Sequence, residues 1–297
     1  VCPTQYHGDP STEYLLEIGS GLHPEIDIMW TGPRVCSQEL SFEHTEAVAA
    51  TLRRPVTFWD NYPVNDAGMK GELHIWPYTG RSPKLPEVSR GYFLNPMNQA
   101  EASKIALGAA AIYMSDPKRY DAEAAWKASA VRVVGEASVD ALAMFRDACA
   151  ISPLHPDDPP RLAHVVDEVK YRIDRGALLE AAGVLSSHML EMKASAELLR
   201  TNPNKKLTQE IAPWLDEYMQ WADIGLEIAK AVEAAGSYAE SLTPAGKTSS
   251  FSMRALSMVG ARNRLARMLQ AAIGFRTRVC SDVLLRLGME IVRRLRY

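Results

Sequence analysis

The first 115 residues repeat one unit, a short apolar segment that ends in polar residues and is followed by a helical pattern. The apolar segments begin near residues 1, 26, 55 and 90, so the repeat is about 30 residues long. A (β/α)8 barrel of about 250 residues has this spacing in each βα unit. The pattern predicts an α/β fold that is one half of such a barrel, with helices over residues 11–22, 41–53 and 98–114.

Half of a barrel leaves an open sheet edge on each side and an exposed apolar face, which makes it unstable alone. We therefore expect a further segment of about 120 to 150 residues to complete the barrel, either upstream of Val1 or on a partner chain. Val1 itself falls within the first apolar segment. This position favours a natural chain that begins earlier.

From about Asp121 onward the pattern is helical, with breaks where prolines and glycines cluster. Apolar residues recur at the i, i+3, i+4 spacing of helices that bury one face. An antiparallel, all-α bundle is the predicted architecture. We place the half-barrel in residues 1–135 and the bundle in residues 136–297. The longer predicted helices cover 171–199, 207–235, 251–273 and 278–296.

Composition is that of a soluble globular protein, with 47% hydrophobic and 23% charged residues. No apolar run approaches the roughly 20 residues of a membrane helix, so no membrane contact is expected. The histidines lack metal-ligand spacing, and neither a metal nor a cofactor is expected. The cysteines form no CxxC pair, which favours free thiols and a reducing compartment such as the cytoplasm. They are Cys2, Cys36, Cys149 and Cys280.

The net charge of −3 hides an asymmetry along the chain. From Phe251 onward there are ten arginines, no lysine and two acids, a balance of +8 that leaves −11 for the rest. Basic tails can bind nucleic acid or anionic surfaces. Here the arginines interleave with apolar residues at helical spacing, so we favour a solvated or ion-paired helix face and expect no nucleic acid. These helices are also a candidate surface for a homodimer or for peptide recognition.

The polar run that follows the third apolar segment is the leading candidate for a functional site. Pro55–Trp59 has the β-branched and aromatic composition of a buried strand, and Asp60–Asp66 is rich in hydrogen-bonding side chains. Enzymes with parallel strands place their chemistry at the carboxyl ends of those strands. A tryptophan next to carboxylates and amides suits a sugar, which has an apolar face and a rim of hydroxyls. Asp60 and Asp66 are the acids that could form a pair here. The alternative is a loop in which Asp60, Asn61 and Asn65 bond their own backbone.

Five motifs occur in order: Cys2–Tyr6, Met29–Pro33, Phe58–Asp66, His74–Arg81 and Leu94–Met97. Together they resemble glycoside hydrolase family 84, the O-GlcNAcases and bacterial β-N-acetylglucosaminidases. The resemblance covers roughly residues 1–130 and implies a TIM barrel of which this chain holds the last four strands. It also implies hydrolysis of terminal β-linked N-acetylglucosamine (GlcNAc), with glycoproteins modified at Ser or Thr as the expected substrate. Hyaluronan- or chitin-type oligosaccharides and a non-catalytic GlcNAc-binding or scaffold protein remain alternatives.

The resemblance implies a retaining mechanism in which the substrate's 2-acetamido oxygen attacks the anomeric carbon to give an oxazoline. In the family two adjacent aspartates do the acid–base work, and this pair is expected upstream of the chain. Asp157-Asp158 is the one adjacent pair in the sequence, but it lies among prolines in the helical region. It does not match the family's pair.

Four matched positions belong to the acetamide end of the substrate. Tyr6 resembles the tyrosine that stabilises the acetamide oxygen as the oxazoline forms, and is the catalytic residue implied in this chain. Cys2, Thr31 and Trp59 resemble the wall of the N-acetyl pocket. For Cys2 and Thr31, filling of the barrel without ligand contact is the alternative.

The other matched positions belong to the sugar rim and the leaving group. Asn61 matches the asparagine that bonds the polarising aspartate. Asp66 matches the carboxylate that holds the O4 and O6 hydroxyls, and Asn95 matches the amide beside it. Val35 falls where the family meets the aglycone. Gln5 departs from the usual Glu, which changes hydrogen bonding near Tyr6 without removing the site.

Overall fold

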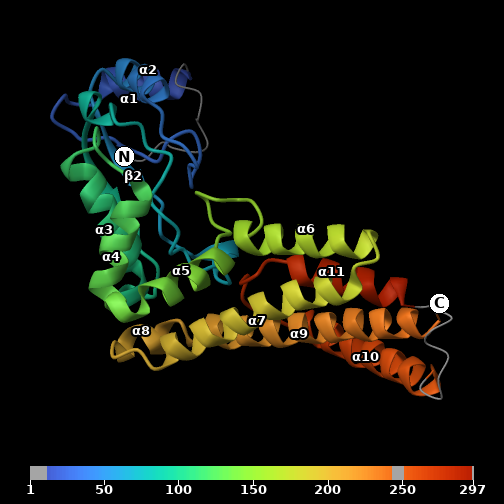
Figure 1. The fold of residues 1–297 in the computed structure, drawn as a ribbon. Helices are drawn as coiled ribbons and strands as arrows, with labels where there is room; N and C mark the ends of the chain where they lie inside the picture. Colours follow the sequence, from blue (N-terminus) through green and yellow to red (C-terminus); the bar gives the residue numbers. More distant parts are fainter. Residues whose placement is uncertain (1–11, 243–250, 296–297) are drawn as a thin grey trace. The chain divides into compact units, whose positions relative to one another are not determined.

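The computed structural model describes residues 12–242 and 251–295, and the chain divides into two compact units (Figure 1). The first unit, here called the α/β unit, comprises residues 1–139, 151–156 and 204–211. The second, the helical unit, comprises residues 140–150, 157–203 and 212–297. The fold is therefore mixed α/β followed by an all-helical region.

The α/β unit is built on parallel strands in the order β1-β2-β3. The strands are β1 (Met29–Trp30), β2 (Val56–Asp60) and β3 (Ser89–Leu94). Parallel strands need crossover connections, and α2 (Phe42–Leu52) forms the one between β1 and β2. α1 (Glu13–Gly21) precedes β1 and packs beside α2.

One face of this sheet is covered by apolar side chains. Trp30 and Phe58 are fully buried in a cluster with Leu15, Val48 and Leu52 from α1 and α2. Successive side chains of a strand point to opposite faces, so Trp59 and Phe93 lie on the other face. These two are 38% and 55% exposed. The second face is therefore open among the described residues.

The other helices of the α/β unit include two that begin at side-chain caps. Asp121 caps α4, because its Oδ1 accepts the backbone N–H of Ala124 at 2.7 Å. Glu210 accepts the N–H groups of Glu101 and Ala102 at 2.8 and 3.1 Å, which caps the start of α3. The elements are α3 (Ala100–Ser115), α4 (Ala122–Val134), α8 (Lys205–Glu210) and the 3-10 turns Ala67–Met69, Leu85–Glu87 and Glu136–Ser138.

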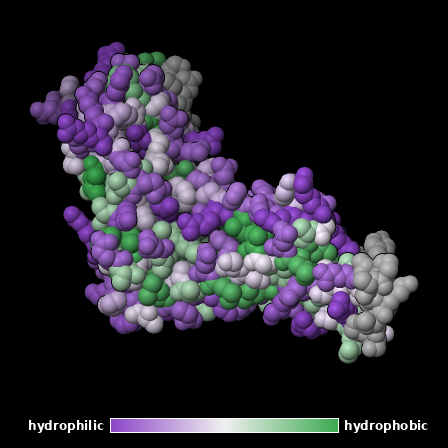
Figure 2. Space-filling view, viewed as in Figure 1, coloured by the Kyte–Doolittle hydropathy of each residue, from purple (hydrophilic) through white to green (hydrophobic). Residues whose placement is uncertain are grey.

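The helical unit is held together by apolar packing between long helices. α7 and α9 form its main contact, and a Cβ added at Gly225 of α9 would lie 2.1 Å from the Met189 sulfur of α7. The helices therefore approach closely at this glycine. Figure 2 shows apolar patches over part of the surface of this unit. The elements are α5 (Val139–Ala148), α6 (Pro160–Asp174), α7 (Leu178–Arg200), α9 (Ala212–Ser241), α10 (Phe251–Ala272) and α11 (Val283–Arg294).

Most predicted elements within the described residues are confirmed, with bounds shifted by a few residues; the helix predicted to end at residue 235, for example, continues to Ser241. The predicted strand at Val1 lies outside the described residues. A single helix over 171–199 is wrong, because α6 ends at Asp174 and Gly176 adopts a φ of +78°. The helix predicted over 207–235 is also divided, since Pro213 cannot donate a backbone hydrogen bond. The domain boundary at residues 135/136 stays a prediction.

In the described parts of the chain, no helix has the length and apolar character needed to span a bilayer. The same residues contain no group of three or more His, Cys, Asp or Glu side chains arranged to hold a metal ion.

Candidate functional site

Three of the predicted site side chains meet at the carboxyl ends of neighbouring strands. Asn61 directly follows β2 and Asn95 directly follows β3. The Oδ1 atom of Asn61 accepts the Trp59 Nε1–H at 2.9 Å and the Asn95 Nδ2–H at 3.1 Å. One amide oxygen therefore fixes the ring of Trp59 and the side chain of Asn95 together.

The loop after β1 joins this group through the same asparagine. Asn61 Nδ2 donates to the Val35 carbonyl at 2.8 Å, which places Val35 beside the end of β2. Thr31 is buried, and its hydroxyl donates to the Arg34 carbonyl at 2.7 Å. Ser37 donates to the Thr31 carbonyl at 2.8 Å. The loop is therefore a locally bonded turn, with the Thr31 hydroxyl engaged inside it.

Asp66 is exposed at the end of the polar run. Its backbone carbonyl accepts the Met69 N–H at 2.8 Å, which begins a 3-10 turn. Within the described residues its carboxylate makes no hydrogen bond or ion pair. The neighbouring Asn65 is buried and donates to the Glu72 carbonyl and to Gln99, at 2.9 and 3.0 Å. Asn65 is thus an anchor of the loop, and Asp66 is the group left available to a ligand.

Cys36 gives an electrostatic link between Asp66 and the loop after β1. Burial raises the pKa of the Cys36 thiol to about 11, and the negative charges of Asp66, Asp60 and Glu72 add to this effect. Because Cys36 is next to Val35 in the chain, Asp66 and the Val35 loop share one electrostatic environment. The thiol stays protonated at neutral pH.

Asp60 does not belong to the open side of the site. Its carboxylate is 1% exposed and forms a two-pronged ion pair with Arg81, with Nη2–Oδ1 at 2.6 Å and Nε–Oδ2 at 2.9 Å. Tyr78 donates to Oδ2 at 2.6 Å. The interpretation of Asp60 as one member of an acid pair with Asp66 is therefore wrong. Because successive side chains of β2 point to opposite faces, Asp60 points away from Trp59 and Asn61.

Other polar groups under the site were not predicted. His74 and Glu72 form a buried pair, with Nε2–Oε2 at 2.8 Å, and the His74 Nδ1 lies 3.0 Å from the Pro63 carbonyl. Tyr62 donates to the Trp76 carbonyl at 2.8 Å. One of the five motifs contains His74, Tyr78 and Arg81. The motif therefore indicated that these residues matter, but the sequence did not show which groups they bond.

The remaining predicted positions are placed as follows. Cys2 and Tyr6 lie outside the described residues. Asp158 belongs to the helical unit, where it pairs with Arg286 at 2.5 Å. The structure brings Val35, Trp59, Asn61 and Asn95 into one hydrogen-bonded group.

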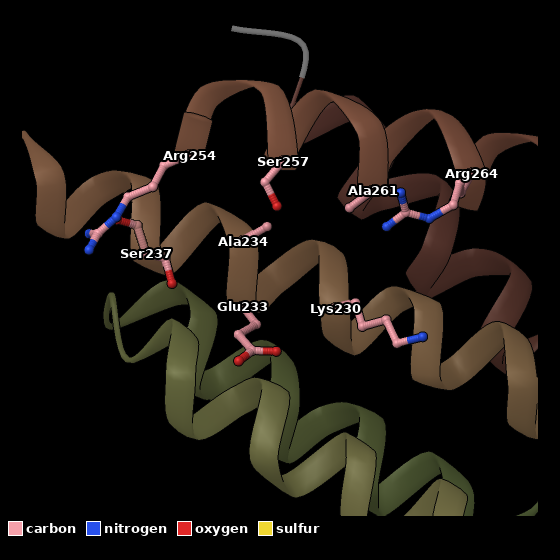
Figure 3. Close-up of a pocket in the computed structure, with 8 residues that line it drawn as sticks. All are labelled: Lys230, Glu233, Ala234, Ser237, Arg254, Ser257, Ala261 and Arg264. Atoms are coloured by element: carbon pink, nitrogen blue, oxygen red, sulfur yellow. The ribbon is translucent and has the colours of Figure 1, made fainter. Parts of the chain in front are cut away.

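A separate hollow of about 480 Å³ lies between α9 and α10 in the helical unit (Figure 3). Arg264 and Lys230 on its wall both pair with Glu227, at 2.7 and 3.5 Å. Arg254 donates to the Ser237 carbonyl at 2.8 Å. Because these cationic groups have partners on the same helices, the hollow is not a candidate for the chemistry described above.

Comparison with known proteins identifies the class to which this geometry belongs. Residues 1–147 match the family model described as beta-N-acetylglucosaminidase. Protein O-GlcNAcase of Rattus norvegicus is 38% identical over 112 residues, which cover 36% of this chain and 12% of that protein. The corresponding protein of Mus musculus is 37% identical over 112 residues.

Solved structures extend the likeness to both units. A mutant of the O-GlcNAc hydrolase of Thermobaculum terrenum matches 99% of this chain and 60% of its own, with 34% identity and a TM-score of 0.90. The protein CpGH84B matches 98% of this chain and 50% of its own, with a TM-score of 0.80. At 20% identity the latter shows the fold alone.

The fold and the matched residues place this chain in a family of glycoside hydrolases. The chain belongs to family 84, the family of β-N-acetylglucosaminidases and O-GlcNAcases. It spans 60% of the Thermobaculum chain, and its match covers 12% of the rat protein.

Proposed function

We propose that this chain carries the sugar-binding part of a retaining β-N-acetylglucosaminidase that removes terminal β-linked GlcNAc from Ser and Thr of glycoproteins. The observation that carries the proposal is the meeting of Trp59, Asn61 and Asn95 at the carboxyl ends of adjacent parallel strands. An aromatic ring, two amides and the unengaged carboxylate of Asp66 are the groups that a sugar needs.

The proposal includes the barrel. We take the three strands as part of the second half of a (β/α)8 barrel, completed by an upstream segment. The open face that bears Trp59 and Phe93 supports this, because exposed apolar sheet faces and unpaired edges are normally covered. In a closed barrel these side chains point into the interior. Residues 136–297 then form the helical domain of the same enzyme.

The chemistry uses the substrate's own acetamide. The acetamide oxygen attacks the anomeric carbon while the glycosidic bond breaks, and the leaving oxygen takes a proton from one aspartate of the upstream pair. Water, deprotonated by the same aspartate, then opens the oxazoline at the anomeric carbon. Two inversions retain the configuration. Tyr6 stabilises the acetamide oxygen during ring closure.

Residues of this chain hold the substrate in this scheme. Trp59, with Cys2 and Thr31, forms the wall around the acetamide methyl, and its ring is held in place by Asn61. Nδ2 of Asn61 has a second N–H beyond the one bonded to Val35, and this hydrogen meets the polarising aspartate. The two groups that grip the O4 and O6 hydroxyls are Asp66 and Asn95, while Val35 faces the aglycone.

A series of aryl β-glycosides assayed with the complete enzyme tests this function. We expect hydrolysis of the β-GlcNAc compound and none of the β-glucoside, which lacks the acetamide. Adding fluorine to the acetyl group weakens its oxygen as a nucleophile, so kcat/KM should fall with each fluorine. Equal hydrolysis of the glucoside, or no dependence on fluorine, contradicts the mechanism. Binding of GlcNAc without any hydrolysis would favour the non-catalytic alternative.

A further inference from the structure

Arg81 is the hub of a buried hydrogen-bond network behind the site. Its side chain is 1% exposed and uses Nε and Nη2 on the Asp60 carboxylate. Its Nη1 donates to the carbonyls of Gln38 and Thr79, at 3.0 and 2.9 Å. Tyr78 completes the coordination of Asp60. One guanidinium therefore joins the end of β2 to the backbone of Gln38, which is 43 residues from Arg81 in the chain.

The backbone next to Arg81 is paired with the same segment. The Leu40 N–H donates to the Gly80 carbonyl at 2.8 Å, and the Ser82 N–H donates to the Leu40 carbonyl at 3.0 Å. Gly80 has a φ of +76°, and a Cβ there would lie 2.2 Å from the Gln38 oxygen. The two segments thus approach so closely that only glycine fits at this position.

These contacts connect Arg81 to the proposed sugar site. Arg81 fixes Gln38 to Asp60 on the buried side of β2. The loop continues back from Gln38 to Val35, whose carbonyl accepts the Asn61 amide at 2.8 Å on the open side. Asp60 also accepts the Asn95 N–H through its backbone carbonyl, at 3.0 Å. The strand end and the loop are therefore clamped from both sides.

We infer that Arg81 is a positioning residue for the sugar site, and that it sets the place of Val35 relative to Asn61 by clamping the loop after β1 to the end of β2. The inference rests on the proposed function, because it concerns the geometry of the same site. Arg81 does not touch the substrate. It acts through Asn61 and the loop.

The chemistry of arginine explains why this residue type stands here. The planar guanidinium can bind both carboxylate oxygens of Asp60 and still donate to two carbonyls, whereas a lysine ammonium is a point charge without that fork. Burial is the largest single influence on the pKa of Arg81 and lowers it, but the charge and hydrogen bonds of Asp60 together with those of Tyr78 raise the pKa overall. The guanidinium therefore stays charged, and Arg81→Lys keeps the charge while losing the fixed geometry.

Arg54 provides a matched control within the same unit. It is also a buried arginine, and it donates to the carbonyls of Gly19, Leu22, His23, Ile26 and Leu52 at 2.7 to 3.0 Å. It precedes β2, at the opposite end of the strand from Asn61. Arg54→Lys removes a comparable network that has no path to the site.

The test is a double-mutant cycle in the complete enzyme, with kcat/KM on an aryl β-GlcNAc substrate and Tm as readouts. We expect Arg81→Lys to lower kcat/KM about tenfold in the presence of Asn61, and less than about twofold in the Asn61→Ala background, because the two act through one geometry. Arg54→Lys should lower Tm and act equally in both backgrounds. If Arg81→Lys does not fold, Tyr78→Phe removes one bond of the same network and should show the same pattern more weakly.

Alkylation of Cys36 by iodoacetamide, followed by peptide mass spectrometry, reports on the clamp without any activity. Release of the loop exposes Cys36, so we expect about a tenfold faster reaction in Arg81→Lys and no change in Arg54→Lys. Unchanged Cys36 labelling, or equal losses of kcat/KM in both backgrounds, overturns the inference. An inactive wild-type enzyme would instead contradict the proposed function, and the labelling would still decide whether Arg81 clamps the loop.

Discussion

Among the described residues, the α/β unit has both buried and surface ion pairs, whereas every ion pair of the helical unit has at least one exposed side chain. In the α/β unit the Arg81–Asp60 ion pair and the His74–Glu72 hydrogen bond are buried beneath the end of β2. In the helical unit, pairs such as Arg286–Asp158 and Arg294–Asp174 lie at the surface and join α11 to residues at the two ends of α6.

The difference shows which interactions fix the structure of each unit. A buried charge is costly unless every hydrogen bond is made, so a buried network admits one geometry. Surface pairs contribute little to stability, and the helical unit depends instead on apolar contacts between α7 and α9. The α/β unit therefore fixes a site, while the helical unit is expected to tolerate changes in its charges.

The largest expected effect is on the core of the helical unit. Leu185 of α7 is fully buried, and Leu185→Ala should cost about 2–5 kcal/mol in free energy of unfolding because it leaves a cavity. Denaturant unfolding and hydrogen exchange in α7 measure this loss. Leu190→Ala, on the exposed side of the same helix, is the control and should change stability little. A large change in kcat/KM from Leu185→Ala would contradict the view that the α/β unit alone fixes the site.

Asp66→Ala should act on activity and not on stability. If the carboxylate holds two hydroxyls, its loss should cost about 2–4 kcal/mol in transition-state binding, or about 30- to 900-fold in kcat/KM. Asp116→Ala removes another exposed aspartate of the α/β unit and serves as the control. A kcat/KM within twofold of wild type for Asp66→Ala would show that this residue does not hold the sugar.

A smaller effect is expected from pH. Burial lowers the pKa of His188 in α7, an effect that Arg161 reinforces and Glu191 opposes. The folded helical unit therefore prefers neutral His188, so its stability is complete above pH 6.5 and falls as pH drops below that value. Hydrogen exchange in α7 between pH 7.5 and pH 5 measures the slope. His188→Gln should flatten it, and an unchanged slope would assign the dependence to other groups.

The smallest effect is expected at the surface pairs. Arg294 bonds Asp174 and Glu290, at 2.8 and 2.6 Å. Arg294→Ala should cost less than about 1 kcal/mol, and raising the salt concentration should shrink the difference from wild type. A loss above about 2 kcal/mol would mean that these pairs act as a network, and the contrast with the α/β unit would weaken.

Local sequence patterns were sufficient to predict most of the helices and strands. The β-branched and aromatic run before Asp60 identified β2, and the 30-residue repeat identified the parallel order of strands and helices. The division of the helix predicted over 171–199 was missed. Gly176 adopts a left-handed backbone conformation there, and a lone glycine inside an apolar repeat does not show this.

The site was predictable where residues follow strand ends, and less so where partners are distant in the chain. Trp59, Asn61 and Asn95 were found because the motifs place them at such ends. The role of Asp60 was misjudged, although alternation along β2 already implied that it points away from Trp59. Its partner Arg81 is 21 residues away, and no local pattern announces a pairing over that distance.

The most direct test of the account is hydrolysis of a fluorogenic β-GlcNAc substrate by the 297-residue chain, alone and joined to the upstream half of the barrel. We predict activity only in the joined protein, because in the proposed mechanism the strand ends described here bind the sugar and the upstream half supplies the acid–base pair. Equal activity of the chain alone would contradict the account, since proton transfer would then depend on residues within these 297.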